Sequence, residues 1–216
     1  RDALGELLAS ARLDLSWTED GWAGPGRDWL QGRSRSARFV MLGEPHFTRE
    51  GIRFFRAVME DLAGHGFEVL AVEMGPRSAE RVETEAGLGS EMLSAFDAGH
   101  PDSVAFLSAE PEREFLVAAR RLGYRFWGLD QEFVLSGTRW LEWLSERPAA
   151  AEASELIESL LGRSREGDRR FREAGDHSGV LLGTDVGEDL ARLREAFAAD
   201  AEAAGLLDDL IVSNRI

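Results

Sequence analysis

The stretch "FVMLGEPHF", residues 39–47, joins a run of strand-forming apolar side chains to a short polar motif. The apolar run stops at Gly43, and Glu44 and His46 follow, separated by a single proline. A short continuous apolar run bounded by glycine predicts a buried strand, here "ARFVMLG" at residues 37–43. An acid and an imidazole two positions apart at its end fit a catalytic pair, a metal site or a polar turn.

Two further apolar runs repeat this pattern along the chain. "FEVLAVE" (67–73) and "YRFWGLD" (124–130) predict a second and a third buried strand. Helical patterns at 48–66, 78–96 and 108–123 fill the connections. Short strands separated by helices favour parallel pairing through βαβ crossovers. The predicted fold class is therefore α/β: a parallel-type sheet built from βαβ units with flanking helices, followed by a mostly helical C-terminal part.

The same pattern suggests a division of the chain into three parts. Residues 1–37 form an N-terminal preface rich in turn-forming residues, and residues 38–137 form the α/β core that carries the site. Residues 138–216 form a helical part packed on the same domain. Within it, residues 184–205 show the plainest helical pattern, whereas residues 163–179 are polar enough for a solvated helix face or a mobile loop.

Composition narrows the classes of partner. The chain of 216 residues is 44% hydrophobic, which is enough to bury a core, and its formal net charge is -15. An acidic surface repels nucleic acid and anionic membranes, so we expect a small-molecule substrate instead. No apolar run approaches the roughly 20 residues of a membrane span. The absence of cysteine excludes disulfides and thiolate nucleophiles but leaves the compartment open, either cytoplasmic or exported after removal of a signal segment.

Polar side chains follow each predicted strand at the point where it ends. Side chains just past the carboxyl ends of parallel strands gather in one crevice, where ligands bind. We therefore expect one pocket at this edge of the sheet. Its predicted residues are Glu44 and His46 after the first strand, Glu73 and Arg77 after the second, and Asp130, Gln131 and Glu132 after the third.

Each of these residues also has a purely structural interpretation. Glu44 and His46 could form only a polar turn, Asp130 could cap a helix, and Glu132 could be solvated. Glu73 is harder to explain in this way, because an acid at the end of a strand buried on both faces needs a partner. Arg77 could supply the compensating charge or hold an anionic substrate.

Three motifs in this order resemble a known family. "FVMLGEPHF", "VLAVEMGPRSAERVE" and "FWGLDQEF" are similar to the erythromycin esterase-like branch of a superfamily that also includes ChaN-like haem-binding proteins and TIKI proteases. The resemblance covers roughly residues 20–140 and implies an α/β core. Glu44 and His46 match the family's GE-x(1–2)-H motif, with a spacing closer to that of ChaN-like members. Glu73 and Asp130 match the acids that end the next two strands.

The leading functional hypothesis is a metal-independent hydrolase of the erythromycin esterase type. His46 would activate water as general base, and Glu44 would orient the imidazole. Glu73 would help to position the water or serve as proton acceptor. Arg77, Asp130, Gln131 and Glu132 would bind the substrate. The chain contains neither a GxSxG motif nor cysteine, which favours direct attack by water over a covalent intermediate.

Two alternatives keep the same residues but change the chemistry. In the first, Glu44, His46, Glu73 and Asp130 bind a divalent metal such as Mn, as in a TIKI-like hydrolase or protease, because an oxygen-rich set suits Mn, Mg or iron. In the second, the protein is a non-catalytic, ChaN-like binder of haem. The candidate axial ligands are then His46, Tyr124 and His177.

Overall fold

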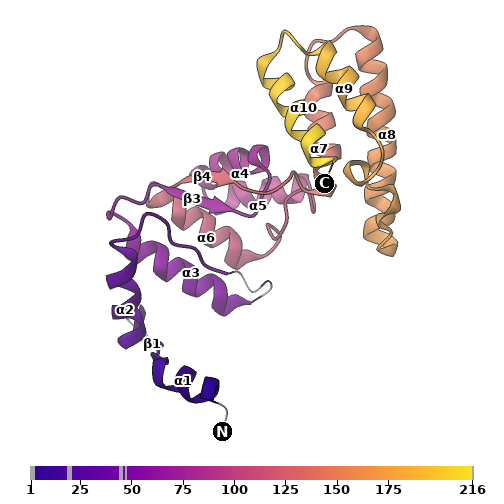
Figure 1. The fold of residues 1–216 in the computed structure, drawn as a ribbon. Coiled ribbons are helices and arrows are strands. Elements are labelled where there is room, and N and C mark those ends of the chain that lie inside the picture. Colours follow the sequence, from indigo (N-terminus) through magenta and orange to yellow (C-terminus); the bar gives the residue numbers. More distant parts are fainter. Residues whose placement is uncertain (1–2, 19–20, 44–45, 47, 216) are drawn as a thin grey trace. The chain divides into compact units, whose positions relative to one another are not determined.

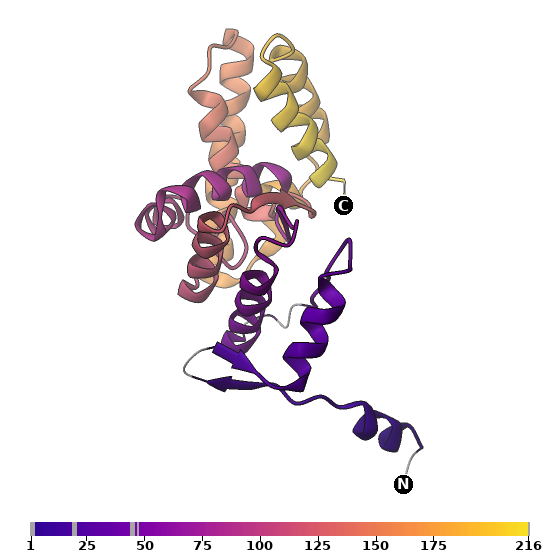
Figure 2. The ribbon, with the colours of Figure 1, turned by 90° about the vertical axis from the view of Figure 1, so that its left-hand side faces the viewer.

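The computed structural model describes residues 3–18, 21–43, 46 and 48–215. The chain divides into two compact units, unit 1 at residues 1–68 and unit 2 at residues 69–216 (Figures 1 and 2). The boundaries expected from the sequence, after residues 37 and 137, fall inside these units.

The described residues of unit 1 form three helices and a short antiparallel strand pair. Its elements are α1 (Ala3–Ala11), β1 (Ser16–Thr18), β2 (Gly21–Ala23), α2 (Pro25–Ser34) and α3 (Arg49–Leu62). Figure 2 shows β1 and β2 beside α2 and α3, whereas α1 stands apart from them. The described side chains of α1 are exposed to solvent, Leu7 and Leu8 among them.

The core of unit 1 lies between β2 and α3. Trp22 of β2 packs its ring edge-on against Phe54 of α3, with the ring centroids 5.6 Å apart. Val58 and Leu62 continue the apolar face of the amphipathic helix. The pattern at residues 48–66 predicted this helix, and Thr48 occupies its N-cap position.

Residues 37–43 depart from the expected strand. All seven are described, and none has strand conformation. Only Val40 packs against the core of unit 1, while Phe39 and Met41 are 81% and 92% exposed. A strand is stabilised by its ladder partner as well as by its own residues, and no ladder bond forms here among the described residues. The predicted first strand is therefore wrong for this structure.

Unit 2 begins with the α/β region, in which the two other predicted strands are confirmed. Its elements are β3 (Val69–Val72), α4 (Pro76–Leu88), α5 (Ser90–Gly99), α6 (Glu110–Arg121) and β4 (Arg125–Gly128). The two strands pair in parallel, with Val69 opposite Arg125 and Val72 opposite Gly128. The three helices form the crossover that parallel pairing requires, and α4 packs on β4 and α6.

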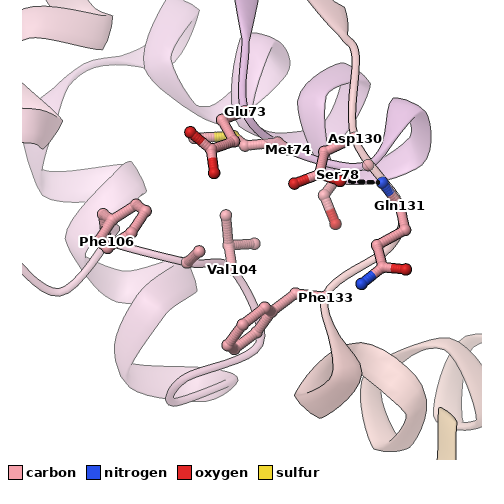
Figure 3. Close-up of a pocket in the computed structure, with 10 residues that line it drawn as sticks. Glu73, Met74, Ser78, Val104, Phe106, Asp130, Gln131 and Phe133 are labelled. Carbon is pink, nitrogen blue, oxygen red and sulfur yellow. Dashed lines mark hydrogen bonds between the residues drawn. The ribbon is translucent and has the colours of Figure 1, made fainter. Parts of the chain in front are cut away.

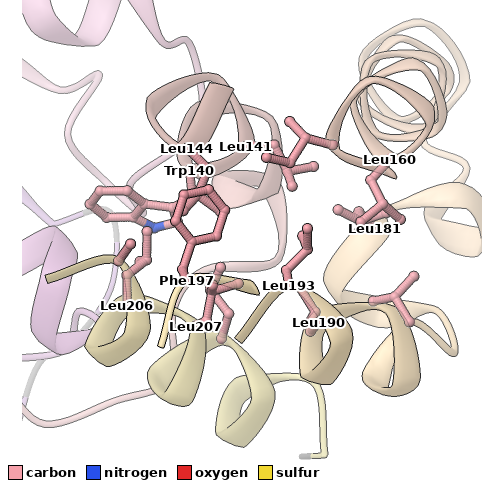
Figure 4. Close-up of a cluster of buried hydrophobic side chains, with 14 of the residues drawn as sticks. Trp140, Leu141, Leu144, Leu160, Leu181, Leu190, Leu193, Phe197, Leu206 and Leu207 are labelled. Carbon is pink, nitrogen blue, oxygen red and sulfur yellow. The ribbon is translucent and has the colours of Figure 1, made fainter. Parts of the chain in front are cut away.

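The rest of unit 2 is helical, as the sequence predicted. It comprises the short 3-10 turns η1 (Val134–Ser136), η2 (His177–Gly179) and η3 (Leu181–Gly183), and the helices α7 (Gly137–Ser145), α8 (Ala151–Ala174), α9 (Gly187–Ala196) and α10 (Ala201–Ser213). These elements enclose a leucine-rich core, in which Leu144, Leu193 and Leu207 are fully buried (Figure 4). The polar stretch at residues 163–179 lies mainly on α8.

The single helix expected at residues 184–205 is instead a pair of helices, α9 and α10. The chain turns between Phe197 and Asp200, and the Asp200 carboxylate accepts bonds from the backbone N–H groups of Glu202 and Ala203. An aspartate in this position starts a new helix, because it satisfies N–H groups that have no partner within the helix. The helical period continues through the turn, so periodicity alone did not reveal the break.

Candidate functional site

The candidate site lies in unit 2, where the parallel strands β3 and β4 end. Glu73 follows the last residue of β3, and Asp130 lies two residues beyond β4. Two backbone bonds extend the pairing past the strands: Leu129 N–H donates to Val72 O at 3.1 Å, and Asp130 N–H donates to Met74 O at 3.1 Å. The two acids therefore leave the same edge of the sheet, as the sequence predicted for the second and third motifs.

Two glycines allow the backbone to pack closely at this edge. A Cβ atom at Gly128 would lie 2.5 Å from the carbonyl oxygen of Gly75. A Cβ atom at Gly75 would lie 2.4 Å from the carboxyl group of Glu132. Both distances are far inside van der Waals contact, so only glycine fits at these positions. The turns that follow β3 and β4 thus approach each other more closely than side chains would permit.

A pocket of about 190 Å³ opens beside these strand ends (Figure 3). Glu73, Asp130 and Gln131 provide its polar side, and Asp130 accepts a hydrogen bond from the N–H of Gln131 at 2.8 Å. Apolar groups form the facing side. The full lining is Glu73, Met74, Gly75, Ser78, Val104, Ala105, Phe106, Asp130, Gln131 and Phe133. The pocket combines charged acceptors with apolar walls, a common composition of small-molecule sites.

Glu132, a predicted substrate ligand, is buried beneath the pocket. Its Oε1 accepts bonds from the backbone N–H groups of Arg77 and Ser78 at 2.8 and 3.0 Å. These groups belong to the first turn of α4, whose N-cap residue is Gly75 and has no side chain to offer. Glu132 therefore caps α4 from a distant part of the chain, and its negative charge is favourable at this helix end.

A buried arginine accompanies Glu132. Arg139 donates from Nη2 to the Ser78 hydroxyl at 2.7 Å, and Ser78 in turn donates to Glu132 Oε2 at 2.5 Å. The guanidinium group also lies 3.8 Å from the ring centroid of Trp140, whose indole N–H donates to Glu132 at 3.1 Å. Burial lowers the pKa of Arg139 to about 10, although Glu132 acts in the opposite direction. The network joins α4 to α7 through Ser78, which lines the pocket.

Arg77 is bound to the last helix of the chain. Its Nε donates to Asp209 of α10 at 2.6 Å, and its Nη1 donates to Glu80 at 3.3 Å. Burial alone would lower the pKa of Arg77, but the bonds and charges of Asp209 and Glu80 raise it. Arg77 therefore stays a cation, and its guanidinium group supports the junction of α4 and α10.

The first motif belongs to unit 1. Glu44 lies outside the described residues, and His46 is an exposed turn residue of unit 1. Glu73, Asp130 and Gln131 all belong to unit 2. The prediction that Glu44 and His46 share a pocket with Glu73 and Asp130 therefore stays a prediction.

The pocket residues alone do not make a metal centre. Glu73 and Asp130 supply two carboxylates, and within residues 3–18, 21–43, 46 and 48–215 no group of three or more His, Asp or Glu side chains could hold a metal ion. Hard divalent cations take about six or more oxygen ligands, of which proteins usually supply several. The metal hypothesis therefore also needs Glu44 and His46 of the first motif, and of these two residues Glu44 lies outside the described part of the chain.

No family model, curated protein or solved structure matches this chain. Among the described helices, none has both the length and the apolar character needed to cross a bilayer.

The structure adds pocket residues that the sequence did not indicate. Ser78 lies in the first turn of α4, where a polar residue is common, so its link to Glu132 gave no distinct signal. Val104 and Phe106 come from the loop between α5 and α6, which has no periodic pattern. Phe133, by contrast, is the last residue of the third motif, directly after the predicted pocket residues Asp130, Gln131 and Glu132.

Proposed function

We propose that the protein is a hydrolase of the erythromycin esterase type, which uses a Glu/His pair to activate water against an ester or related bond of a small molecule. One observation carries the proposal: Glu73 and Asp130 line a single pocket at the carboxyl ends of two parallel strands. This is the position in which open α/β sheets bind their ligands. The motif "GEPHF" at residues 43–47 supplies the imidazole that the chemistry needs.

The reaction follows general acid–base catalysis. His46 takes a proton from water as the water oxygen attacks the ester carbonyl carbon, and Glu44 orients the imidazole and stabilises its charged form. Glu73 accepts a hydrogen bond from the same water and fixes its direction of attack. When the tetrahedral intermediate collapses, the carbon–oxygen bond breaks and the leaving alcohol takes the proton from the imidazolium ion. The protein returns to its starting state without a covalent intermediate.

Different pocket residues offer different kinds of contact to a substrate. Asp130 and Gln131 offer acceptors for substrate hydroxyl or cationic groups, and Val104, Phe106 and Phe133 offer apolar contact. For Arg77 and Glu132 we infer a supporting role instead of the direct substrate contact that the sequence suggested. Their polar groups are already bonded to Asp209 and to the first turn of α4.

A matched pair of histidine variants tests the proposal. His46→Ala should lower kcat/KM about 100- to 10,000-fold, the usual range for loss of a general base. His65→Ala, which removes another exposed histidine of unit 1, should leave it unchanged. The assay is hydrolysis of a panel of nitrophenyl esters and lactones, erythromycin among them. Equal activity of the two variants on a confirmed substrate would exclude His46 as the base.

Variants of the pocket acids extend the test to unit 2. Glu73→Gln should reduce kcat, because the amide is a weaker acceptor for the attacking water. Asp130→Asn should act mainly on KM, because Asp130 is assigned to binding. If kcat falls for neither variant, the pocket does not take part in the chemical step.

The same protein preparation decides between the proposal and its two alternatives. Elemental analysis and an assay with EDTA distinguish a metal-dependent hydrolase, which would contain stoichiometric metal and lose activity. Addition of haem tests the alternative of a non-catalytic haem-binding protein, which would show a Soret shift that His46→Ala abolishes. Activity that survives EDTA, without a Soret shift, supports the proposal.

A further inference from the structure

One wall of the pocket is a loop with an unusual backbone. Residues 101–109, here called the wall loop, connect α5 to α6 and contribute Val104, Ala105 and Phe106 to the pocket lining. In Figure 3 the Val104 side chain points toward the space between Glu73 and Phe133. The wall loop thus faces the acids across the pocket.

Two residues of the wall loop are held in a sparsely populated conformation. Asp102 has a φ angle of 61° and Phe106 one of 63°, and they are the non-glycine residues with positive φ in the described part of the chain. Aspartate visits this left-handed region fairly often, whereas a bulky residue such as phenylalanine does so rarely. Such conformations persist only where the surroundings fix them, and they concentrate at binding and catalytic sites.

Two arginines bind the wall loop near these residues. Arg172 of α8 donates from Nε to Asp102 Oδ2 at 3.2 Å and from Nη2 to the Pro101 carbonyl oxygen at 3.3 Å. Arg113 of α6 donates from Nη1 to the carbonyl oxygens of Leu107 and Ser108 at 2.9 and 2.6 Å. Asp102 and Phe106 therefore each lie beside an arginine anchor.

Arg172 is the anchor that reaches the wall loop from a distant element. It comes from a 24-residue helix, whereas Arg113 belongs to the helix that directly continues the loop. A buried acid on the same helix, Asp168, lies 3.9 Å from Nη2 of Arg172. Thr138 donates a hydrogen bond to that carboxylate at 2.7 Å, which fixes it in turn. The position of the wall loop is thus linked to the helical part of unit 2.

We propose that Arg172 is a positioning residue that holds the wall loop in its pocket-forming conformation, so that the loop determines which substrates fit; the link to substrates rests on the proposed hydrolase function. Arg172 does not line the pocket itself and acts only through Asp102 and Pro101. Because the wall loop contributes apolar surface instead of reacting groups, its loss should weaken substrate binding more than it slows the chemical step.

Hydrogen exchange measures the first part of the proposal without any substrate. Backbone N–H groups of Ser103 and Ala109 donate to carbonyl oxygens of His100 and Phe106, so their exchange reports the conformation of the wall loop. Arg172→Gln should speed exchange in a peptide covering residues 101–109 about three- to tenfold, since both bonded groups are partly exposed and a larger effect is not expected.

Arg169→Gln provides the matched control. Arg169 lies one turn earlier on α8 and pairs with Glu166 and Glu173 in solvent. Its loss should leave exchange in residues 101–109 unchanged. Asp102→Asn provides a second test should Arg172→Gln fail to fold, because asparagine tolerates the left-handed backbone but lacks the charge that Arg172 binds. Unchanged exchange in a folded variant, or an equal increase throughout unit 2, would overturn the positioning role.

Kinetics then test the consequence for specificity. Arg172→Gln should raise KM about three- to tenfold for bulky apolar esters, with kcat within about twofold of the unmodified protein. Small acetate esters should show less change, because they offer less apolar surface to the wall loop. A fall in kcat with constant KM would contradict the proposal. Absence of hydrolysis by the unmodified protein would instead remove the proposed function, while the exchange experiment would still decide whether Arg172 holds the loop.

Discussion

Residues 37–43 of unit 1 and β3 of unit 2 have nearly the same local pattern but different structures. Each is a short apolar run that leads into a glutamate, "FVMLGE" in the first and "VLAVE" in the second. β3 pairs with β4 through a parallel ladder, whereas residues 37–43 form no strand and expose Phe39 and Met41. The two segments show that an apolar run indicates the capacity to form a strand, and that a ladder partner makes the strand.

The largest expected difference between the two regions comes from removing a phenylalanine ring from each. Phe126 of β4 is 4% exposed, so Phe126→Ala should lower the free energy of unfolding by about 3–5 kcal/mol. Phe39→Ala should change it by no more than about 0.5 kcal/mol, because the ring lies in solvent. Urea unfolding followed by circular dichroism measures both. A cost for Phe39→Ala comparable to that for Phe126→Ala would mean that residues 37–43 are packed in solution.

The glycines of the two regions should differ by a smaller amount. Gly128→Ala forces a methyl group against the backbone of Gly75 and should cost about 1–3 kcal/mol, the usual range for overpacking. At Gly43 nothing lies within 4 Å of an added Cβ among the described residues. Gly43→Ala should therefore be neutral or stabilise by up to about 1 kcal/mol through the unfolded chain. The same urea titration compares them, and equal losses would contradict the close approach of the strand ends.

The smallest expected effects come from two aspartates that respond to pH in opposite directions. Burial would raise the pKa of Asp61 in unit 1, but the hydrogen bond from Arg27 and its charge lower it overall. Asp61 therefore stabilises the folded state above its unfolded pKa, and this contribution is lost as pH falls through the folded pKa. In unit 2, burial raises the pKa of Asp168, whose side chain is 4% exposed. Its ionised form destabilises the folded state, so stability increases as pH falls through the raised pKa.

Measuring the stability of asparagine variants at pH 7, 5 and 3 distinguishes these opposite pH dependences. Asp61→Asn should cost no more than about 1 kcal/mol at pH 7, since the ion pair is partly solvated, and the cost should vanish at acid pH. For Asp168→Asn, the unmodified protein should gain stability relative to the variant as pH falls, with no further gain below the ordinary aspartate pKa of 3.8. Parallel pH profiles for the two variants would contradict the assignment.

Much of the fold was predictable because helices depend on local patterns. The apolar face of α3 was located from residue spacing, and the strands β3 and β4 were located from short apolar runs. The pairing partners of strands and the breaks between helices were harder to predict from the sequence. The sequence could not show that residues 37–43 have no ladder partner among the described residues, or that Asp200 starts a new helix within an unbroken helical period.

The candidate site was predictable to the extent that it depends on strand ends. Glu73, Asp130 and Gln131 line one pocket, because parallel strands bring their carboxyl ends to the same edge. The sequence did not show that Glu132 caps α4. The N-cap residue of α4 is Gly75, which has no side chain to cap the helix and lies more than fifty residues before Glu132. Nor did the sequence show the wall loop, since a left-handed backbone at Phe106 has no residue signature.

The parallel pairing of β3 with β4 also has a consequence for the order of folding. The paired residues Val69 and Arg125 are more than fifty positions apart, so the ladder forms only after a long loop has closed. The turn between α9 and α10 spans only residues 197–200, and such local contacts form early. We expect the leucine-rich helices to collapse first and the strand ends to meet late. The pocket between Glu73 and Asp130 would then be among the last features to assemble, and its appearance would report that unit 2 has completed folding.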